Sequence, residues 1–191
     1  MSYFQTQESV EQYIRMAEGI DGRELIAKLQ AYLPPGASVL ELGMGAGKDL
    51  DLLAEHYAVT GSDSSDAFID RYRRSNPQAD LVNLDAVSID TERRFDAIYS
   101  NKVLFLFSEE ELAASIERQT SVLRPAGIVL HSFWAGDHYE EYGGMPVYHR
   151  DEQFLTSAFS DLFEILALDR YAEMEQDDSI VLLARSRRMD A

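Results

Sequence analysis

The chain has 191 residues, which is the size of one globular domain with a single core. Its 34 acidic and 17 basic residues give a formal net charge of −17, and a field of that sign repels polyanions, so we expect neither nucleic acid nor a membrane surface as a partner. Cysteine is absent, which excludes disulfides, thiolate zinc sites and a cysteine nucleophile. Residues 1–19 lack a leader pattern and no apolar run approaches ~18 residues, so a cytoplasmic location is expected.

Two amphipathic helices are predicted at the N-terminus. Residues 6–18 carry apolar side chains at helical spacing. Asp21 and Glu24 have the spacing of a capping box that opens a second helix. We expect residues 1–35 to form a helical lid and residues 36–191 to form the cofactor-binding core of one domain.

Strands and helices alternate from residue 37 onward, and Ser108 with Glu111 has the spacing of a further capping box. Such alternation predicts a doubly wound α/β domain, with a mostly parallel sheet and helices on both faces. Two final strands have no helix between them and should pair as an antiparallel hairpin. The expected strands cover residues 37–42, 57–61, 80–84, 95–100, 126–134, 162–168 and 179–184.

A glycine-rich turn follows the first strand, with glycines at 43, 45 and 47. Glycines there let the backbone approach a ligand closely, and the next helix presents free N–H groups. Asp63 ends the second strand, twenty positions beyond Gly43, where a carboxylate can accept ribose hydroxyls. Each residue alone could serve only a turn or a helix cap. Their joint spacing predicts a nucleoside-containing ligand.

Two ligands compete for this turn. A dinucleotide site has the form G-x-G-x-x-G/A, but here the third glycine comes one residue early and Lys48 stands where Gly or Ala is expected. Glu41 also reaches the mouth of the turn, where its carboxylate would oppose a pyrophosphate and suit an ammonium group. These residues favour S-adenosylmethionine over NAD or NADP.

The segment Val-Leu-Glu-Leu-Gly-Met-Gly-Ala-Gly at 39–47 resembles the first motif of the class I S-adenosylmethionine-dependent methyltransferases, a Rossmann-like superfamily. The resemblance continues through Asp63, through residues 83–86, 95–101 and 123–127, and through the terminal hairpin. It covers about residues 37–185 and implies a seven-stranded sheet of order 3-2-1-4-5-7-6, with S-adenosylmethionine as cofactor.

The resemblance also implies roles for individual residues. Glu41 would hold the methionine amino group, Asp63 the ribose, Asp85 the adenine amino group and Asn101 the methionine end. Ser64 departs from the family pattern, which places an aliphatic residue against the adenine, so the apolar partner of the ring is unassigned. Asp85 could alternatively be a turn residue. The implied cofactor-binding residues are Glu41, Gly43, Met44, Gly45, Gly47, Asp63, Ser64, Asp85, Ala86 and Asn101.

The acceptor side is predicted around the aromatic loop 134–149, which follows the fifth strand. His138 and His149 in this loop are candidate catalytic bases, and Tyr13 could cover the site from the lid. His131 lies on a strand and should be a packed residue. A metal site from Asp137 with the two loop histidines lacks a regular ligand motif, so no metal is expected.

The resulting hypothesis is S-adenosylmethionine-dependent methyl transfer to a small-molecule acceptor, neutral or cationic given the net charge. Two alternatives have different chemistry. One is a non-catalytic protein that binds S-adenosylmethionine or S-adenosylhomocysteine, because methyl transfer needs no unique catalytic residue. The other is an NAD(P)-dependent oxidoreductase. Methylation of a protein is less favoured, and nothing in the sequence indicates an oligomeric state.

Overall fold

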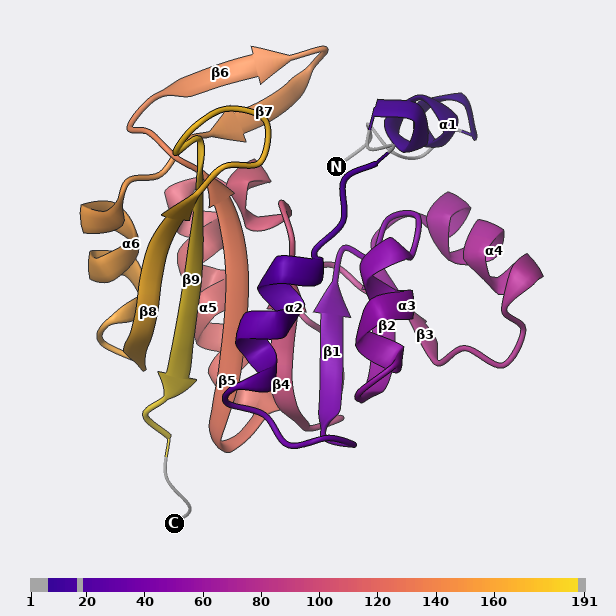
Figure 1. Ribbon diagram of the computed structural model, residues 1–191, viewed down its shortest axis with the longest axis horizontal. Helices are drawn as coiled ribbons and strands as arrows, with labels where there is room; N and C mark the ends of the chain where they lie inside the picture. The colour runs from indigo at the N-terminus through magenta and orange to yellow at the C-terminus, as the bar shows by residue number, and fades with distance from the viewer. Residues whose placement is uncertain (1–6, 17–18, 189–191) are drawn as a thin grey trace.

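The computed structural model describes residues 7–16 and 19–188 (Figure 1). Its helices are α1 (Gln7–Met16), α2 (Arg23–Gln30), α3 (Lys48–Ala54), α4 (Asp66–Ser75), α5 (Glu109–Val122), α6 (Glu152–Phe159) and a 3-10 turn at Leu104–Leu106. Its strands are β1 (Ser38–Leu42), β2 (Ala58–Asp63), β3 (Leu81–Asn83), β4 (Phe95–Ser100), β5 (Leu123–Trp134), β6 (Tyr139–Tyr142), β7 (Met145–Tyr148), β8 (Phe163–Tyr171) and β9 (Ser179–Ser186).

Seven strands form the central sheet in the order β3-β2-β1-β4-β5-β9-β8. The first five are parallel, and β9 runs antiparallel to both β5 and β8. This confirms the predicted order 3-2-1-4-5-7-6 and the antiparallel pair at the C-terminus. None of the helices within residues 7–16 and 19–188 is long and apolar enough to cross a lipid bilayer, and the cytoplasmic location stays a prediction.

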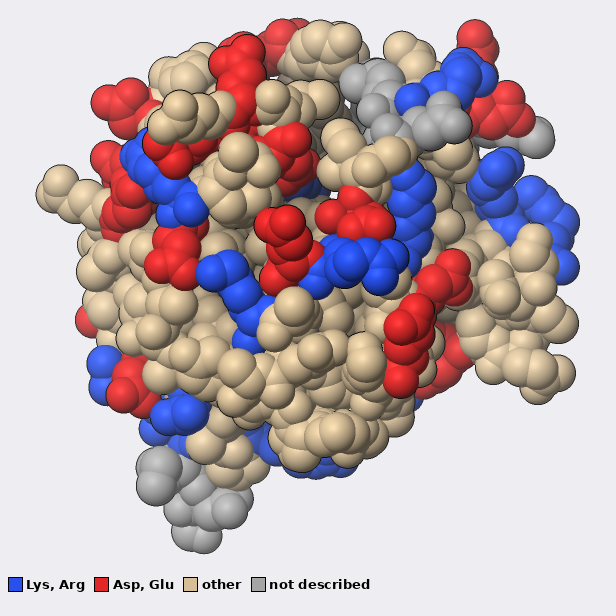
Figure 2. Space-filling view, in the orientation of Figure 1, with Lys and Arg blue, Asp and Glu red and all other residues tan. Residues whose placement is uncertain are grey.

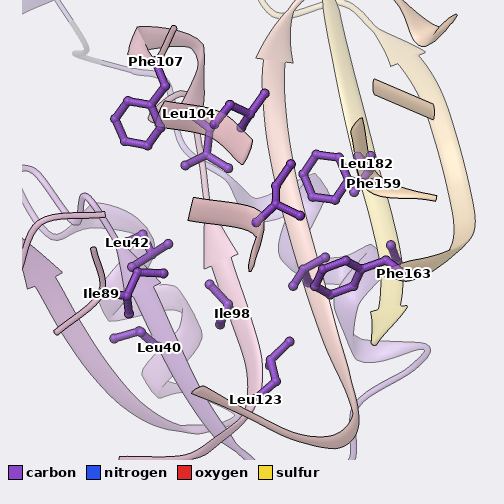
Figure 3. Close-up of a cluster of buried hydrophobic side chains, with 14 of the residues drawn as sticks. Leu40, Leu42, Ile89, Ile98, Leu104, Phe107, Leu123, Phe159, Phe163 and Leu182 are labelled. Atoms are coloured by element: carbon purple, nitrogen blue, oxygen red, sulfur yellow. The ribbon is translucent and has the colours of Figure 1, made fainter. Parts of the chain in front are cut away.

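Apolar side chains cover both faces of the sheet because neighbouring residues of a strand point to opposite sides. Leu40 and Leu42 of β1 belong to a cluster on one face that extends through Ile98 of β4 to Phe159 of α6 (Figure 3). Val39, which directly precedes Leu40, belongs to a second cluster with α2 and α3 on the other face. A sheet buried on both sides leaves only its edges for ligands, which places a site at the carboxyl ends of the strands.

The two predicted capping boxes have different outcomes. The Ser108 hydroxyl accepts from the Glu111 N–H at 3.2 Å and the Glu111 carboxylate accepts from the Ser108 N–H at 2.9 Å, as expected. The Asp21–Glu24 box is wrong, because α2 starts after Gly22 and no side chain caps it. The Asp21 carboxylate instead accepts the N–H two residues further on. The N–H of Gly22 is bonded inside the functional site described below.

Two features of residues 135–162 were not predicted. β6 and β7 form an antiparallel hairpin outside the main sheet, where only a loop was expected. Gly143 and Gly144 join the two strands with φ values of 58° and 84°, which is the region that two-residue hairpin turns require. Helix α6 follows, capped by the Asp151 carboxylate, which accepts the Phe154 N–H at 2.7 Å.

Candidate functional site

A cleft of about 800 Å³ opens at the carboxyl ends of the parallel strands. Its walls come from the glycine turn after β1, the ends of β2, β4 and β5, the β6–β7 hairpin and the β8–β9 loop. Nine of the ten residues predicted to bind a cofactor line it. The exception is Gly47, which packs against another side chain. The fold therefore brings these nine residues to one cleft, and their role in binding a cofactor stays a prediction.

The glycine turn is shaped by close packing. Gly47 caps α3 with φ of 84°, and a Cβ atom there would lie 2.2 Å from the Tyr72 ring. Gly43 has φ of 68°, and its Cβ would lie 2.5 Å from the Val103 side chain. Glycine adopts a positive φ without strain and has no Cβ atom, so it alone avoids both the backbone strain and these clashes. Gly47 thus builds the turn, while Gly43 borders the cleft.

The Asp63 carboxylate holds the glycine turn in place through hydrogen bonds to the backbone. Its carboxylate accepts the Gly45 N–H at 3.0 Å and the Ser65 N–H at 2.9 Å, which ties the end of β2 to the glycine turn. The residue is 8% exposed, and burial raises the pKa of its carboxyl group although these N–H groups lower it. A carboxylate has about four lone-pair positions, so two bonds from the backbone leave capacity for ligand hydroxyls.

Glu41 is the most unusual group in the cleft. It is 3% exposed, and its Oε2 atom is buried with no hydrogen-bond partner. Burial raises the pKa of Glu41 well above its usual value, and the nearby carboxylates of Asp49 and Asp63 raise it further. Buried charges in proteins are normally paired or neutralised, so this carboxyl group calls for a cationic ligand or a proton.

Asp49 is a site residue that the sequence reasoning missed. Its carboxylate accepts the Gly22 N–H at 2.7 Å, the Tyr99 hydroxyl at 2.7 Å and the Asn101 amide at 3.1 Å. It therefore joins α3, β4 and the segment before α2 at the floor of the cleft. A Cβ on Gly22 would lie 2.0 Å from the Tyr99 oxygen, which explains glycine at that position. The signal for Asp49 in the sequence was the presence of an acidic residue in the first turn of the helix that follows the glycines.

The two remaining polar residues predicted to bind the cofactor, Asp85 and Asn101, both form hydrogen bonds within the protein. Asp85 accepts the Val87 N–H at 2.7 Å through Oδ1, so the turn role left open for it is present. Asn101 accepts from the Ser132 hydroxyl at 2.6 Å while it donates to Asp49. The apolar wall that Ser64 does not supply is present nearby. It consists of Phe68, Leu84, Ala86, Val87 and Leu106.

Lys102 lies on the wall of the cleft formed by the ends of β4 and β5, next to Trp134. Its ammonium is 3.4 Å from the centre of the Trp134 ring and 3.3 Å from the Glu173 carboxylate. It also donates to the Ser179 hydroxyl at 2.6 Å. Burial lowers the pKa of Lys102 to about 8, although Glu173 opposes that change. These contacts attach the β8–β9 loop to the end of β4, so this wall of the cleft is held in place.

The two predicted bases lie together at the base of the hairpin. The rings of His138 and His149 stack with centroids 3.9 Å apart. His149 Nδ1 is 3.0 Å from the Ala135 carbonyl oxygen, and its Nε2 is 3.0 Å from the Glu140 carboxylate. The role of the two histidines as bases stays a prediction. The side chain of Tyr13 lies outside the described part of the structure.

His131 is fully buried, as expected of a packed residue. Its Nδ1 is 2.8 Å from the Ser100 hydroxyl and its Nε2 is 2.9 Å from the Gln119 side-chain oxygen. Burial lowers the pKa of His131 to about 3, so the ring is neutral at physiological pH. It is therefore part of the core and does not take part in proton transfer.

Charge distinguishes the cleft from most ligand sites. Acidic side chains gather over the β6–β7 hairpin and the β8–β9 loop in Figure 2. Among the residues that the structure describes, eight acidic and two basic ones line the cleft, and one of the basic residues, Lys102, is already paired with Glu173. The acidic ones are Asp21, Glu41, Asp49, Asp63, Asp85, Glu111, Glu140 and Glu173. Such a cleft repels phosphates and attracts cations.

The topology and the cleft at its switch point define a Rossmann-like α/β nucleoside-binding domain. Residues 39–127 match the family model described as a methyltransferase domain. The order of the sheet, with its antiparallel final pair, agrees with that match. Over residues 39–127 the match therefore supports the predicted likeness to the class I S-adenosylmethionine-dependent methyltransferases.

Two curated relatives illustrate the range of this family. The chain is 30% identical over 117 residues to a dTDP-3-amino-3,6-dideoxy-alpha-D-glucopyranose N,N-dimethyltransferase from Streptomyces fradiae, covering 60% of this chain and 46% of that protein. It is 32% identical over 111 residues to a trans-aconitate 2-methyltransferase from Variovorax paradoxus, covering 56% and 41%. The chain thus spans less than half the length of these relatives.

A similar solved structure is the 1,6-didemethyltoxoflavin-N1-methyltransferase of Burkholderia thailandensis, with bound 1,6-didemethyltoxoflavin and S-adenosylhomocysteine. The TM-score is 0.80 at 22% identity, and the match covers 99% of this chain and 84% of that one. A second is the N-methyltransferase NodS from Bradyrhizobium japonicum, with a TM-score of 0.74 at 16% identity, covering 96% and 100%. At these identities the likeness concerns the fold.

Proposed function

We propose that this protein transfers a methyl group from S-adenosylmethionine to a small amine. The observation that carries the cofactor assignment is the buried Glu41 carboxyl group, whose Oε2 atom lacks a hydrogen-bond partner and which lies among other carboxylates. A pyrophosphate would be repelled there, whereas the ammonium of an amino-acid moiety would neutralise the site. This argues against the NAD(P)-dependent alternative.

The residues of the cleft fit the cofactor along its whole length. Glu41 and Asp49 would face the methionine ammonium, and Asp63 would accept the ribose hydroxyls. Ala86 and the apolar wall around Phe68 would enclose the adenine, with Asp85 beside its amino group. The cofactor supplies an activated methyl group on a sulfonium, so the protein's task is to orient the acceptor and exclude water.

The acidic rim supports an amine as the acceptor. The curated relatives include an enzyme named for an amino sugar and one named for trans-aconitate, so the family alone does not choose between an amine and a carboxylate. Glu111 and Glu140 line the cleft here, and Lys102, which also lines it, is paired with Glu173. A carboxylate acceptor would meet net repulsion, while an ammonium or neutral amine would not.

The hairpin and the N-terminal segment would close the cleft. One face of the hairpin borders the cavity through Tyr142, Met145 and Val147, and Ile14 and Ile20 border it from the N-terminal side. We include in the proposal that residues 1–35 act as a lid over a core formed by residues 36–191. Removal of residues 1–18 should then weaken both cofactor and acceptor binding, because a lid covers both.

Label transfer from S-adenosylmethionine carrying a labelled methyl group tests the proposal. The acceptor panel should pair amino sugars and other small amines with hydroxyl and carboxylate analogues of similar size. Trp134→Ala should raise the acceptor KM and leave the affinity for S-adenosylhomocysteine unchanged, with His56→Ala as the control. Binding of S-adenosylhomocysteine without transfer to any acceptor would favour the non-catalytic alternative. Thermal stabilisation by NAD alone would overturn the cofactor assignment.

A further inference from the structure

One face of the β6–β7 hairpin carries two histidines and a glutamate. Glu140 lies opposite Val147 and Tyr142 opposite Met145, and the ladder extends to His149, whose N–H donates to the His138 carbonyl at 2.9 Å. Side chains alternate between the faces of a strand, so His138, Glu140 and His149 share one face. That face borders the cleft through Glu140 and His149.

The hydrogen bonds of His149 leave an electron pair facing a carboxylate. Its Nδ1 lies 3.0 Å from the Ala135 carbonyl oxygen, which can only accept, so Nδ1 carries a proton. In the neutral ring Nε2 is then an acceptor, yet it lies 3.0 Å from the Glu140 carboxylate, which is also an acceptor. Two acceptors at that distance need a cation between them, either a proton or a metal ion.

We propose that His138, Glu140 and His149 form a binding site for one borderline divalent cation of the Zn²⁺, Ni²⁺ or Cu²⁺ class. Their ligand atoms lie within 4.8 Å of one another, and among the described residues these three form the one cluster with that property. Two imidazoles and a carboxylate suit these ions better than Mg²⁺ or Ca²⁺, which prefer oxygen ligands. The bond from His149 Nδ1 to a backbone carbonyl is the orientation that metal-binding histidines usually have.

Binding requires one rearrangement of side chains. The two rings are nearly parallel, at 17°, and an ion cannot lie in the planes of both stacked rings. His138 is exposed, so its ring can rotate with little loss of packing, whereas His149 is held by Ala135. Tetrahedral zinc with Zn–N bonds of about 2.0–2.1 Å needs ligand atoms about 3.3 Å apart, so the atoms must close from the present limit of 4.8 Å.

An ion bound at this place would affect both the hairpin and the cleft. His138 and His149 lie on opposite strands at the base of the hairpin, so an ion shared by them and Glu140 would cross-link β6 to β7 beside the cleft. It would also occupy the two histidines predicted to be bases and remove Glu140 from contact with an acceptor. This inference does not depend on the proposed methyl transfer, because ion binding is measured without cofactor or acceptor.

The test is calorimetric titration of Zn²⁺ and Ni²⁺ into chelator-treated full-length protein that carries no polyhistidine tag. We expect one ion per chain, with affinity reduced at least tenfold in His149→Ala and in Glu140→Gln. His56→Ala is the matched control, because His56 is the other exposed histidine. It lies between α3 and β2, at the amino ends of the strands and away from the cleft. Thermal unfolding of each variant shows whether it is folded.

A second measurement identifies the atoms. In ¹⁵N NMR spectra of the histidine rings, Zn²⁺ should shift the signals of His138 and His149 and leave those of His56 and the buried His131 in place. The proposal is overturned if neither ion binds stoichiometrically at about 100 μM, if binding is unchanged in folded His149→Ala, or if His56→Ala abolishes it.

Discussion

Replacing Glu41 by glutamine should stabilise the free protein and weaken cofactor binding. The substitution keeps the shape of the side chain and removes a buried negative charge that has no partner on Oε2 and lies near Asp49 and Asp63. Glutamine is neutral, so it avoids both the cost of burying a charge and the repulsion from Asp49 and Asp63, and a gain of about 1 kcal/mol shifts the Tm of a chain of this size by about 2–4 °C. We therefore expect Glu41→Gln to raise Tm by at least about 2 °C.

The affinity for S-adenosylhomocysteine should change in the opposite direction. A hydrogen bond to a charged group contributes about 1.5–3 kcal/mol, so loss of the carboxylate should weaken binding by about ten- to hundredfold. Glu55→Gln is the matched control, since Glu55 is exposed at the end of α3. Calorimetry measures the affinity and thermal scans measure the stability. A lower Tm combined with unchanged affinity would refute the placement of the ammonium at Glu41.

The pH dependence follows from the raised pKa of Glu41. The usual pKa is 4.5, and the folded value lies well above it, so between the two values the folded state binds more protons than the unfolded state. Stability from this group therefore falls as pH rises through that interval, and Glu41→Gln should lack this part of the slope. Ligand binding should release a proton there, which calorimetry in buffers of different ionisation enthalpy detects.

Three further predictions concern the walls of the cleft. Asp63→Asn should weaken S-adenosylhomocysteine binding by about ten- to hundredfold and should also lower Tm. Asp63 accepts two backbone N–H groups, and the amide of asparagine can replace only one of the two carboxylate oxygens as an acceptor. An unchanged Tm in thermal scans would contradict this structural role. Gly47→Ala should destabilise the protein more than Gly36→Ala does in denaturant titrations, because both have a φ near 80° but only at Gly47 would a Cβ meet a side chain, that of Tyr72. Glu173→Gln should lower the pKa of Lys102 below about 8, measured by NMR at the Lys102 side chain, because the Glu173 charge holds that pKa up.

The sequence was sufficient for the central sheet and for the position of the cleft. The strand before Gly43 and the acid at position 63 follow local rules, because parallel strands are apolar throughout and the turn between strand and helix needs glycine. Register then places residues distant in sequence side by side, with Glu41 of β1 opposite Gly61 of β2 and Tyr99 of β4. Local patterns of this kind can be interpreted without tertiary information.

The features that were missed depend on tertiary contacts. Asp49 was one of several acidic residues in a first helical turn, and only the fold brings Gly22, Tyr99 and Asn101 to its carboxylate. The Asp21 cap was wrong because α2 starts one residue later, after Gly22, whose N–H is bonded to Asp49. The hairpin had a signal in the adjacent Gly143 and Gly144, but its strands have only four residues each, lie outside the main sheet and are too short to show a hydrophobic period.

Asp49 links the floor of the cleft to its cover. The same carboxylate accepts from Asn101 beneath the proposed methionine end and from Gly22, which leads out of the N-terminal segment. Burial raises the pKa of Glu41 and the Asp49 carboxylate raises it further, so a cation next to both groups would lower the repulsion between them. If the cofactor ammonium lies at Asp49 as proposed, cofactor binding and the position of residues 19–22 act on one shared group. Coupling between them needs no long pathway, because one carboxylate contacts both.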